Sequence, residues 1–286
     1  MLESSITQIQ SLLSWANEQL RPSSDNAMLD TEVLLCHCLN KNRSFLRAWP
    51  EHSPNQLQIQ QFQTLIQERL RGMPIAYLTG QKEFWSRNFT VSPDVLIPRP
   101  DSELLIELSL SLLPKNQPCK IIDLGTGSGI LALTLAAERP KCDVLATDIS
   151  HAALRIAQLN AKQLQIDNVR WLQSSWFEQV TEIDFDLIVS NPPYIVANDP
   201  HLLQGDVRFE PKTALISAEN GLHDIRILAD KSRAHLKHQG HLLVEHGYNQ
   251  QHAVQAIFKQ FNYSEIATHP DLSGNPRVTS GVWNPL

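Results

Sequence analysis

The sequence predicts an α/β protein: a Rossmann-like sheet, parallel with an antiparallel closing strand, plus a small N-terminal helical domain. From residue 120 onward, short apolar segments alternate with helical segments, which is typical of a parallel sheet covered on both faces. The first 74 residues have only helical periodicity. Two strand-like segments between residues 263 and 283 flank a turn, which predicts the closing pair. At 286 residues the chain is long enough for one large domain and a smaller one.

The first 74 residues predict three or four helices, because apolar residues recur there at helical spacing. The expected segments run from Ile6 to Leu20, from a cap at Asp25 or Asn26 to Leu39, and from Ser53-Pro54 to Leu70. Gly72 and Pro74 follow the last segment and are typical helix terminators.

Residues 75–100 change in character, because strand-forming residues replace the helical pattern. A Ser-Pro-Asp break at 92–94 predicts a hairpin-like connector. A Pro-Asp-Ser-Glu segment at 100–103 begins a helix, with proline in the first turn and acids near the positive end of the dipole. We therefore expect a helical domain at 1–74, a connector at 75–100 and a sheet domain at 101–286.

The sheet domain is expected to alternate strands and helices before it closes with the antiparallel pair. The expected strands are 121–124, 144–147, 169–172, 185–189 and 241–245, the helices are 130–138, 152–164 and 253–261, and the closing pair is 263–268 and 277–283.

A glycine-rich loop, Asp-Leu-Gly-Thr-Gly-Ser-Gly at 123–129, follows the first expected strand and opens a helix. Glycines at such a turn let the backbone bend tightly and approach a ligand closely. Asp148 ends the second strand, where a carboxylate can accept hydrogen bonds from both hydroxyls of a ribose. The alternative for Asp148 is a solvated acid at a strand end. Together, the loop and Asp148 predict a nucleoside site.

The spacing of this loop favours a nucleoside without a pyrophosphate. The loop reads Gly-x-Gly-x-Gly and continues with Ile130, whereas the dinucleotide pattern has glycine or alanine at that sixth position. A carboxylate at Asp123 would repel two phosphates, and it suits an adenosine that carries a cationic sulfonium. A second role remains open for Asp123, which could instead cap the next helix.

The expected acceptor site is the Asn191-Pro192-Pro193-Tyr194 turn, which follows an apolar strand at the carboxyl edge of the sheet. A planar NH₂ group offers two hydrogen-bond donors. The Asn191 side-chain oxygen and the Pro192 carbonyl would accept both, and Tyr194 would pack against the flat acceptor. We therefore predict methyl transfer from S-adenosylmethionine to an amide or amine nitrogen. The alternative is an ordinary turn stiffened by proline.

Composition limits the other possibilities. A formal net charge of -6 and the absence of a long basic block disfavour duplex binding. Cys36-His37-Cys38 lacks the second cysteine pair of a metal site, so we expect free thiols and no metal. The sequence has neither a signal-like start nor an apolar stretch of membrane-spanning length, so we expect a cytoplasmic protein and a monomer. Arg99 and Glu245 are not assigned to the site.

The chain resembles the bacterial release factor glutamine methyltransferases (the PrmC or HemK family) over essentially its whole length. The matching stretches are 71–80 (RGMPIAYLTG), 83–85 (EFW), 96–103 (LIPRPDSE), 125–129, 191–194, 204–211 (QGDVRFEP) and 245–247 (EHG). The Asn-Pro-Pro-Tyr turn is shared with DNA adenine methyltransferases. The 98–103 segment points to this subgroup, because the related ribosomal-protein enzymes usually have serine after the Pro-Arg pair.

The resemblance implies a seven-stranded class I methyltransferase sheet and S-adenosylmethionine as the cofactor. It implies transfer to the side-chain amide of the glutamine in the Gly-Gly-Gln motif of class-1 peptide chain release factors, in support of translation termination. The helical N-terminal domain would help to dock the release factor, and no direct contact with nucleic acid or membrane is expected.

The resemblance also carries roles onto individual residues. The matching cofactor positions are Gly125, Thr126, Gly127, Ser128, Gly129, Asp148, Trp176 and Asn191, and the glutamine pocket matches Asn191, Pro192, Pro193 and Tyr194. Trp176 would lie near the adenine, unless it is a plain core tryptophan. Asn191, Pro192 and Tyr194 are the catalytic candidates. The chain departs from the family at Ser175, where an acid is common, which puts a polar contact to the adenine in doubt.

Two other classes of function stay open at this point. One is methyl transfer to a ribosomal-protein glutamine or to an adenine or cytosine amine, the latter requiring a basic cleft and an extruded base. The other is a nucleotide-binding protein or dehydrogenase without transferase activity, which Ile130 and the intact 191–194 turn disfavour.

Overall fold

The computed structural model describes residues 7–285, so Ile6, the start of the first expected helix, lies outside the described residues. Contacts along the chain separate two compact units. The first runs to Gln81 and includes Leu203–Phe209, and the second comprises Lys82–Leu202 and Glu210–Leu286. The three-part division at residues 74 and 100 stays a prediction. Among the described residues, no helix is both long and apolar enough to cross a membrane.

The first unit is helical and has its own apolar core. Its helices are α1 (Ile9–Leu20), α2 (Ala27–Leu39), α3 (Arg43–Ala48), α4 (Gln56–Leu70) and α5 (Ile75–Thr79). The core includes Leu12, Leu34 and Phe62, all fully buried. Asn55 and Gln58 form a reciprocal capping box at the start of α4. Of the two residues expected to cap α2, Asn26 is at the N-cap position, but its side chain makes no capping hydrogen bond.

The connector contains a hairpin whose turn lies elsewhere than predicted. Strands β1 (Gln81–Phe84) and β2 (Arg87–Thr90) pair across a turn at Trp85 and Ser86. Both turn residues have positive φ, 51° and 57°, as a two-residue hairpin turn requires. The prediction that the hairpin turns at residues 92–94 was therefore wrong. The true turn lacks the glycine or asparagine that normally marks this backbone conformation.

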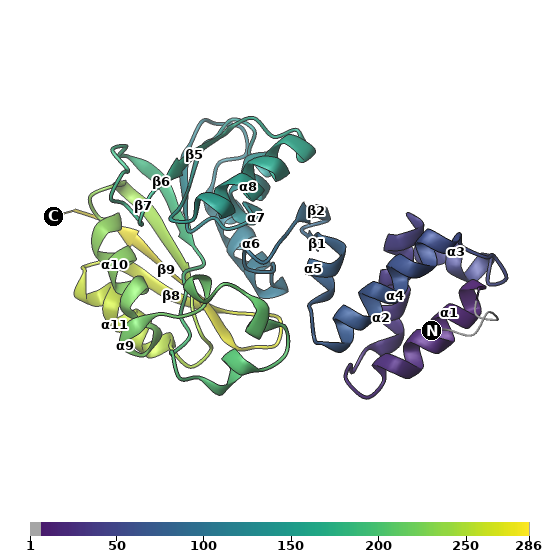
Figure 1. The fold of residues 1–286 in the computed structure, drawn as a ribbon. Helices are drawn as coiled ribbons and strands as arrows, with labels where there is room; N and C mark the ends of the chain where they lie inside the picture. The colour runs from purple at the N-terminus through teal and green to yellow at the C-terminus, as the bar shows by residue number, and fades with distance from the viewer. Residues whose placement is uncertain (1–6, 286) are drawn as a thin grey trace. The chain divides into compact units, whose positions relative to one another are not determined.

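The second unit is built on the predicted sheet, whose seven strands lie in the order β5-β4-β3-β6-β7-β9-β8 (Figure 1). The strands are β3 (Lys120–Leu124), β4 (Asp143–Asp148), β5 (Val169–Gln173), β6 (Phe185–Ser190), β7 (Leu236–Glu245), β8 (Ser264–Pro270) and β9 (Pro276–Trp283). The first five are parallel, and β9 pairs antiparallel with both β7 and β8. The predicted parallel sheet with an antiparallel closing pair is confirmed.

Helices cover both faces of this sheet (Figure 1). One face carries α6 (Glu103–Leu112), α7 (Ile130–Glu138) and α8 (His151–Leu164), and the other carries α10 (His223–Ser232) and α11 (Gln251–Gln260). Successive residues of β3 pack on opposite faces of the sheet. Ile121 packs in the core that includes α6 and α7, and Ile122 packs in the core that includes α10 and α11. This double burial explains why the strands are apolar without alternation.

Several features of the structure had no counterpart in the sequence analysis. Helix α5, helix α10 and the short α9 (Ala218–Gly221) were not expected. Glu219 and Asn220 within α9 have positive φ, which interrupts the helical periodicity on which a prediction depends. Cys119 and Cys142, which precede the neighbouring strands β3 and β4, form a disulfide, whereas Cys36 and Cys38 are free thiols.

Candidate active site

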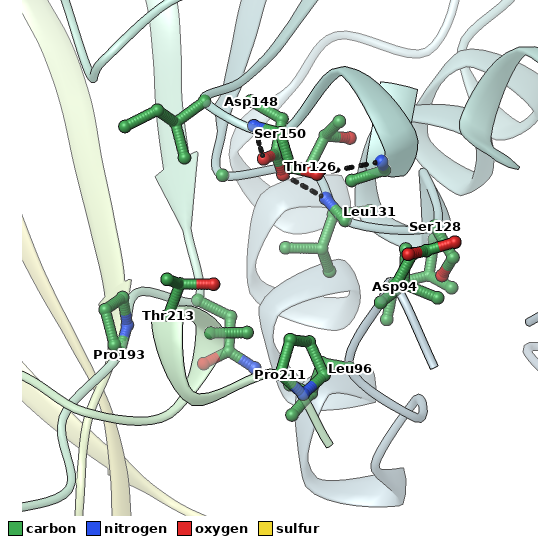
Figure 2. A pocket seen from close by; sticks show the side chains of 18 of the residues that line it. Asp94, Leu96, Thr126, Ser128, Leu131, Asp148, Ser150, Pro193, Pro211 and Thr213 are labelled. Atoms are coloured by element: carbon green, nitrogen blue, oxygen red, sulfur yellow. Dashed lines mark hydrogen bonds between the residues drawn. The ribbon is translucent and has the colours of Figure 1, made fainter. Parts of the chain in front are cut away.

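The site lies where the direction of the strand order reverses. Strand β3 has β4 on one side and β6 on the other, so the loops after these strands diverge and leave a crevice at the carboxyl edge. A cavity of about 360 Å³ occupies this position. Figure 2 shows Thr126 and Asp148 at one end of the cavity and Pro193 and Pro211 at the other. Such a volume is typical of small-molecule sites.

Most of the predicted site residues line this one cavity. The lining includes Gly125, Thr126, Gly127, Ser128, Asp148, Trp176, Asn191 and Pro193. Gly129, Pro192 and Tyr194 lie next to it in the chain without lining it. The lining also includes Ser175, the position at which the chain departs from the family pattern.

The glycine loop is shaped by backbone conformations that other residues rarely adopt. Gly125, Gly127 and Gly129 all have positive φ, at 73°, 56° and 85°. The amides of Gly125 and Thr126 both donate to the carbonyl of Thr147, at 2.9 and 2.8 Å, which fastens the loop to the end of β4. The loop therefore reaches its shape through backbone bonds to the neighbouring strand β4.

Gly129 has a packing role in addition to its conformation. A Cβ atom there would lie 3.0 Å from Leu133 Cδ1 and 3.1 Å from the Cβ of Ala157. Gly127, by contrast, faces open space, with nothing within 4 Å of the same position. Gly129 thus lets α7 and α8 approach each other, while Gly127 leaves room at the cavity.

Asp148 both supports the loop and faces the cavity. Its Oδ2 atom accepts from the Gly127 amide at 2.9 Å, and its Oδ1 atom accepts from the Ser150 amide at 2.8 Å. Burial raises the pKa of the carboxyl, and these amide hydrogen bonds act in the opposite direction. Each carboxylate oxygen can accept more than one hydrogen bond, so Asp148 retains the capacity to bind ribose hydroxyls.

Of the two roles left open for Asp123, the structure shows the helix cap. Its Oδ2 atom accepts from the Thr126 hydroxyl at 2.6 Å and from the Ala132 amide in the first turn of α7 at 3.1 Å. Asp123 is fully buried and is not part of the cavity lining. Burial raises its pKa to about 7. The carboxyl therefore stabilises the loop from behind and does not face a ligand.

Trp176 forms a side wall at the end of the cavity where Thr126 and Asp148 lie, which is the predicted nucleoside end. A Cβ atom on Gly125 would lie 3.4 Å from the Trp176 ring, so the ring packs closely over the loop. The indole Nε1 donates to Asp224 Oδ1 at 3.1 Å, which holds the ring in place. Ile149, exposed over 65% of its surface, also lines the cavity. An aromatic face and an aliphatic side chain together suit a flat heterocycle.

At the other end of the cavity, the predicted acceptor end, Asn191 is held through its side-chain nitrogen. Asn191 Nδ2 donates to Ser102 Oγ at 3.0 Å, and the Ser102 hydroxyl donates to Glu245 Oε2 at 2.7 Å. The Tyr194 hydroxyl donates to the other oxygen, Glu245 Oε1, at 3.3 Å. Glu245 and Ser102 are both buried. Burial raises the pKa of Glu245 to about 7 and the pKa of Tyr194 above its ordinary value.

Sequence reasoning did not assign Ser102 or Glu245 to the site. Ser102 belongs to the segment quoted for the family resemblance, and its position at a helix start suggested only a terminus. Glu245 ends an apolar strand at the carboxyl edge, and that position was the available signal. Asn160, also missed, donates to the carbonyls of Ser128 and Thr90 at 2.9 and 3.0 Å and so anchors the loop to the hairpin.

An ion pair between a partly exposed arginine and a buried glutamate joins two walls of the cavity. Arg99 pairs with Glu210, whose Oε2 atom also accepts from the Ile97 amide at 3.2 Å. The neighbours of these residues, Pro98 and Pro211, line the cavity. The ion pair therefore holds the segment before α6 against the segment after the 191–194 turn.

Comparisons with known proteins show the family to which the chain is similar. The family described as "PrmC N-terminal domain" matches residues 11–80, and the "Methyltransferase small domain" matches residues 102–204. The chain is 46% identical to a release factor glutamine methyltransferase of Shewanella oneidensis, over 95% of this chain and 94% of the relative. It is 49% identical to the protein of the same name from Salmonella typhimurium, over 95% of this chain and 98% of the relative.

The fold is shared with solved methyltransferases. A crystal structure of a methyltransferase from Pyrococcus furiosus superposes with a TM-score of 0.55 at 18% identity, over 78% of this chain and 98% of that chain. At this level of identity the likeness shows the fold alone.

Proposed function

The chain belongs to the release factor glutamine methyltransferases, and we propose that it methylates the glutamine of the Gly-Gly-Gln motif in class-1 peptide chain release factors. The methyl group would come from S-adenosylmethionine and would be placed on the side-chain amide nitrogen. This modification would support translation termination.

One observation carries this proposal: a single cavity is lined by a carboxylate, Asp148, at one end and by an amide, Asn191, whose nitrogen is engaged by Ser102, at the other. A nucleoside site alone would fit many enzymes. An asparagine whose nitrogen is already engaged leaves its oxygen to accept from an incoming NH₂ group. The pairing of the two ends in one cavity favours transfer to an amide or amine nitrogen.

The residues at the nucleoside end fit S-adenosylmethionine. Asp148 would accept from the ribose hydroxyls, the Trp176 ring and Ile149 would lie beside the adenine, and the open loop at Gly127 leaves space for close approach. The bound donor supplies a methyl group on a positively charged sulfur. The Asp123 carboxyl does not line the cavity. It accepts hydrogen bonds from Thr126 and Ala132 and so stabilises the loop.

The residues at the acceptor end would hold the substrate amide. The Asn191 side-chain oxygen and the Pro192 carbonyl would accept its two N–H groups, which orients the nitrogen lone pair toward the donor end of the cavity. Positioning of this kind accounts for a large part of the barrier reduction in many enzymes, on the order of 7–11 kcal/mol at most. Pro193 would pack against the glutamine side chain, and Tyr194 would support the turn through its bond to Glu245.

No strong base is required for this reaction. An amide nitrogen that has gained a methyl group is cationic and loses its proton readily to water. The chain's own contribution is therefore orientation of the amide and exclusion of bulk water from it.

We further propose that the helical N-terminal domain helps to dock the release factor and that the reaction takes place in the cytoplasm, where release factors act. The matched family domain at residues 11–80 supports a dedicated role for this part of the chain.

The decisive experiment is mass spectrometry of a purified class-1 release factor incubated with this protein and S-adenosylmethionine. The matched control is the same release factor with its motif changed from Gly-Gly-Gln to Gly-Gly-Ala. We expect one added methyl group, mapped by peptide analysis to that glutamine and absent from the control. Parallel titrations with S-adenosylmethionine and NAD should show binding of the former only.

If S-adenosylmethionine binds but the release factor stays unmodified, the release factor is not the substrate. The substrate would then be a ribosomal protein or a nucleic acid. Binding of NAD in place of S-adenosylmethionine would overturn the transferase assignment itself.

A further inference from the structure

A continuous chain of hydrogen bonds connects the acceptor asparagine to a buried carboxyl group. Asn191 Nδ2 donates to Ser102 Oγ at 3.0 Å, and the Ser102 hydroxyl donates to Glu245 Oε2 at 2.7 Å. The Tyr194 hydroxyl donates to the second carboxylate oxygen, Glu245 Oε1, at 3.3 Å. The four residues come from the start of α6, the turn after β6 and the end of β7. Ser102 and Asn191 line the cavity, whereas Glu245 does not.

The chemistry of the groups gives this chain one direction. An ionised carboxylate only accepts hydrogen bonds, so the Ser102 hydroxyl must donate its single hydrogen to Glu245. The lone pairs of Ser102 are then the only groups it can present to Asn191. Asn191 must therefore turn its NH₂ end toward Ser102 and its oxygen the other way.

The direction matters because the two ends of an asparagine amide have nearly the same shape and opposite hydrogen-bonding character. With the oxygen facing the cavity, Asn191 can accept from a substrate NH₂ group. With the amide reversed, two NH₂ groups would face each other and neither could accept.

We propose that Ser102 and Glu245 are positioning residues that fix the direction of the Asn191 amide, so that its oxygen faces the acceptor nitrogen. This inference rests on the proposed function for its catalytic consequence, although the orientation itself is a property of the protein alone. Glu245 is not a general base, because both of its oxygens are occupied by hydroxyl groups and it has no surface in the cavity.

The charge of Glu245 sets the direction, so the arrangement responds to pH. The titratable and charged groups around it are the Tyr194 phenol, Arg277 and Asp101. Arg277 pairs with Asp101 at 3.2 Å, and the neighbouring His246 is bonded to Thr279 Oγ1 at 2.8 Å. Burial raises the pKa of Glu245 to about 7. Below that pH the protonated carboxyl can donate to Ser102, and the hydroxyl no longer has to accept from Asn191. We expect kcat to rise as the pH increases through about 7.

The first test compares three serine variants. Ser102→Ala should lower kcat by about 10- to 100-fold, the range that follows from a misplaced reacting group. The KM for the release factor and the dissociation constant of S-adenosylmethionine should change by less than about threefold. Ser102→Thr, which keeps the hydroxyl, should restore most of kcat.

Ser109→Ala is the matched control for loss of a buried hydroxyl. Ser109 is also fully buried in α6, and its hydroxyl has no hydrogen-bond partner within residues 7–285. This variant should retain the wild-type kcat. Glu245→Gln introduces a donor in place of the acceptor, so it should lower kcat and remove the rise near pH 7.

A second measurement does not depend on turnover. The side-chain amide signal of Asn191, assigned in the NMR spectrum by its loss in Asn191→Asp, should show slow proton exchange in the wild type. The exchange should become fast in Ser102→Ala and stay slow in Ser109→Ala.

These outcomes distinguish a failure of the proposed function from a failure of the positioning role. A wild-type protein that shows the slow Asn191 signal but methylates no release factor would contradict the proposed function and leave the orientation intact. A Ser102→Ala variant with wild-type kcat, or an Asn191 signal that is unchanged in it, would overturn the positioning role.

Discussion

The two ends of the cavity are built in different ways. The nucleoside end is centred on residues 123–150, one strand–loop–helix–strand stretch whose shape comes from backbone bonds such as those of Gly125 and Thr126 to Thr147. Trp176 adds a side wall from outside this stretch. The acceptor end is made by side chains from three separate parts of the chain, with Ser102 and Glu245 separated by 143 positions.

The two ends should therefore respond differently to substitution. A backbone cradle tolerates many side-chain changes, provided that the glycines and the supporting acid remain. A relay of side-chain hydrogen bonds has a direction and loses it when one member changes. We therefore expect substitutions at the acceptor end to act on turnover, and substitutions at the nucleoside end to act on cofactor affinity or on stability.

The largest expected effect is that of Asn191→Ala. Loss of the accepting oxygen should lower kcat by about 10³-fold or more, as for removal of a group that acts mainly in the transition state. The affinity for S-adenosylmethionine should stay within about tenfold, because Asn191 is only one of the residues expected to contact the cofactor. Single-turnover assays and calorimetric titration measure the two quantities. An active variant would remove Asn191 from the acceptor site.

The next effect is that of Asp148→Ala on the nucleoside end. Loss of hydrogen bonds from a charged acceptor, about 1.5–3 kcal/mol, should weaken binding of S-adenosylmethionine by about 10- to 100-fold. Turnover at saturating cofactor should change less. The control is Asp143→Ala, an acid at the opposite end of the same strand that pairs with Arg170 at 3.0 Å. Equal losses in both variants would count against a ribose-binding role.

A smaller effect on stability should distinguish two glycines of the loop. Gly129→Ala combines a left-handed backbone with contacts near 3 Å to Leu133 and Ala157, so it should lower the free energy of unfolding by about 2 kcal/mol. Gly127→Ala has the backbone strain alone and should cost about 1 kcal/mol. Urea denaturation monitored by tryptophan fluorescence gives both values. A larger loss of unfolding free energy in Gly127→Ala than in Gly129→Ala would show that the helices are not tightly packed at Gly129.

The smallest effect concerns Ser175, which lines the cavity beside Trp176. Ser175→Asp would add a charged acceptor near the expected adenine and should tighten S-adenosylmethionine binding by about threefold, corresponding to a partly exposed hydrogen bond. Ser175→Ala should leave the affinity almost unchanged. A weaker affinity in Ser175→Asp would place the adenine elsewhere in the cavity.

Much of the sheet domain could be predicted because its signals are local. The expected strands and helices from residue 121 to 189 coincide closely with β3 to β6, since each is a short apolar or periodic run between turn residues. The hairpin turn could not be predicted, because Trp85 and Ser86 adopt positive φ without the residues that usually mark such a turn. Helix α10 was missed although it has the local signal of a helix, with Ile225, Leu228 and Ala229 buried at helical spacing. At the hairpin turn, the pairing of β1 with β2 overrides the local preference of the two turn residues.

Local sequence patterns were sufficient to predict the fold class and the positions of the glycine loop, Asp148 and the Asn191 turn, because each of these depends on neighbours within a few residues. That Asp123 caps α7 and turns away from the cavity, and that Ser102 and Glu245 meet Asn191, became evident only in the folded chain. The physical reason is that hydrogen-bond direction depends on which side chains meet in space. Residues 102, 191 and 245 become neighbours only when β6 and β7 pair in the sheet and α6 packs against it.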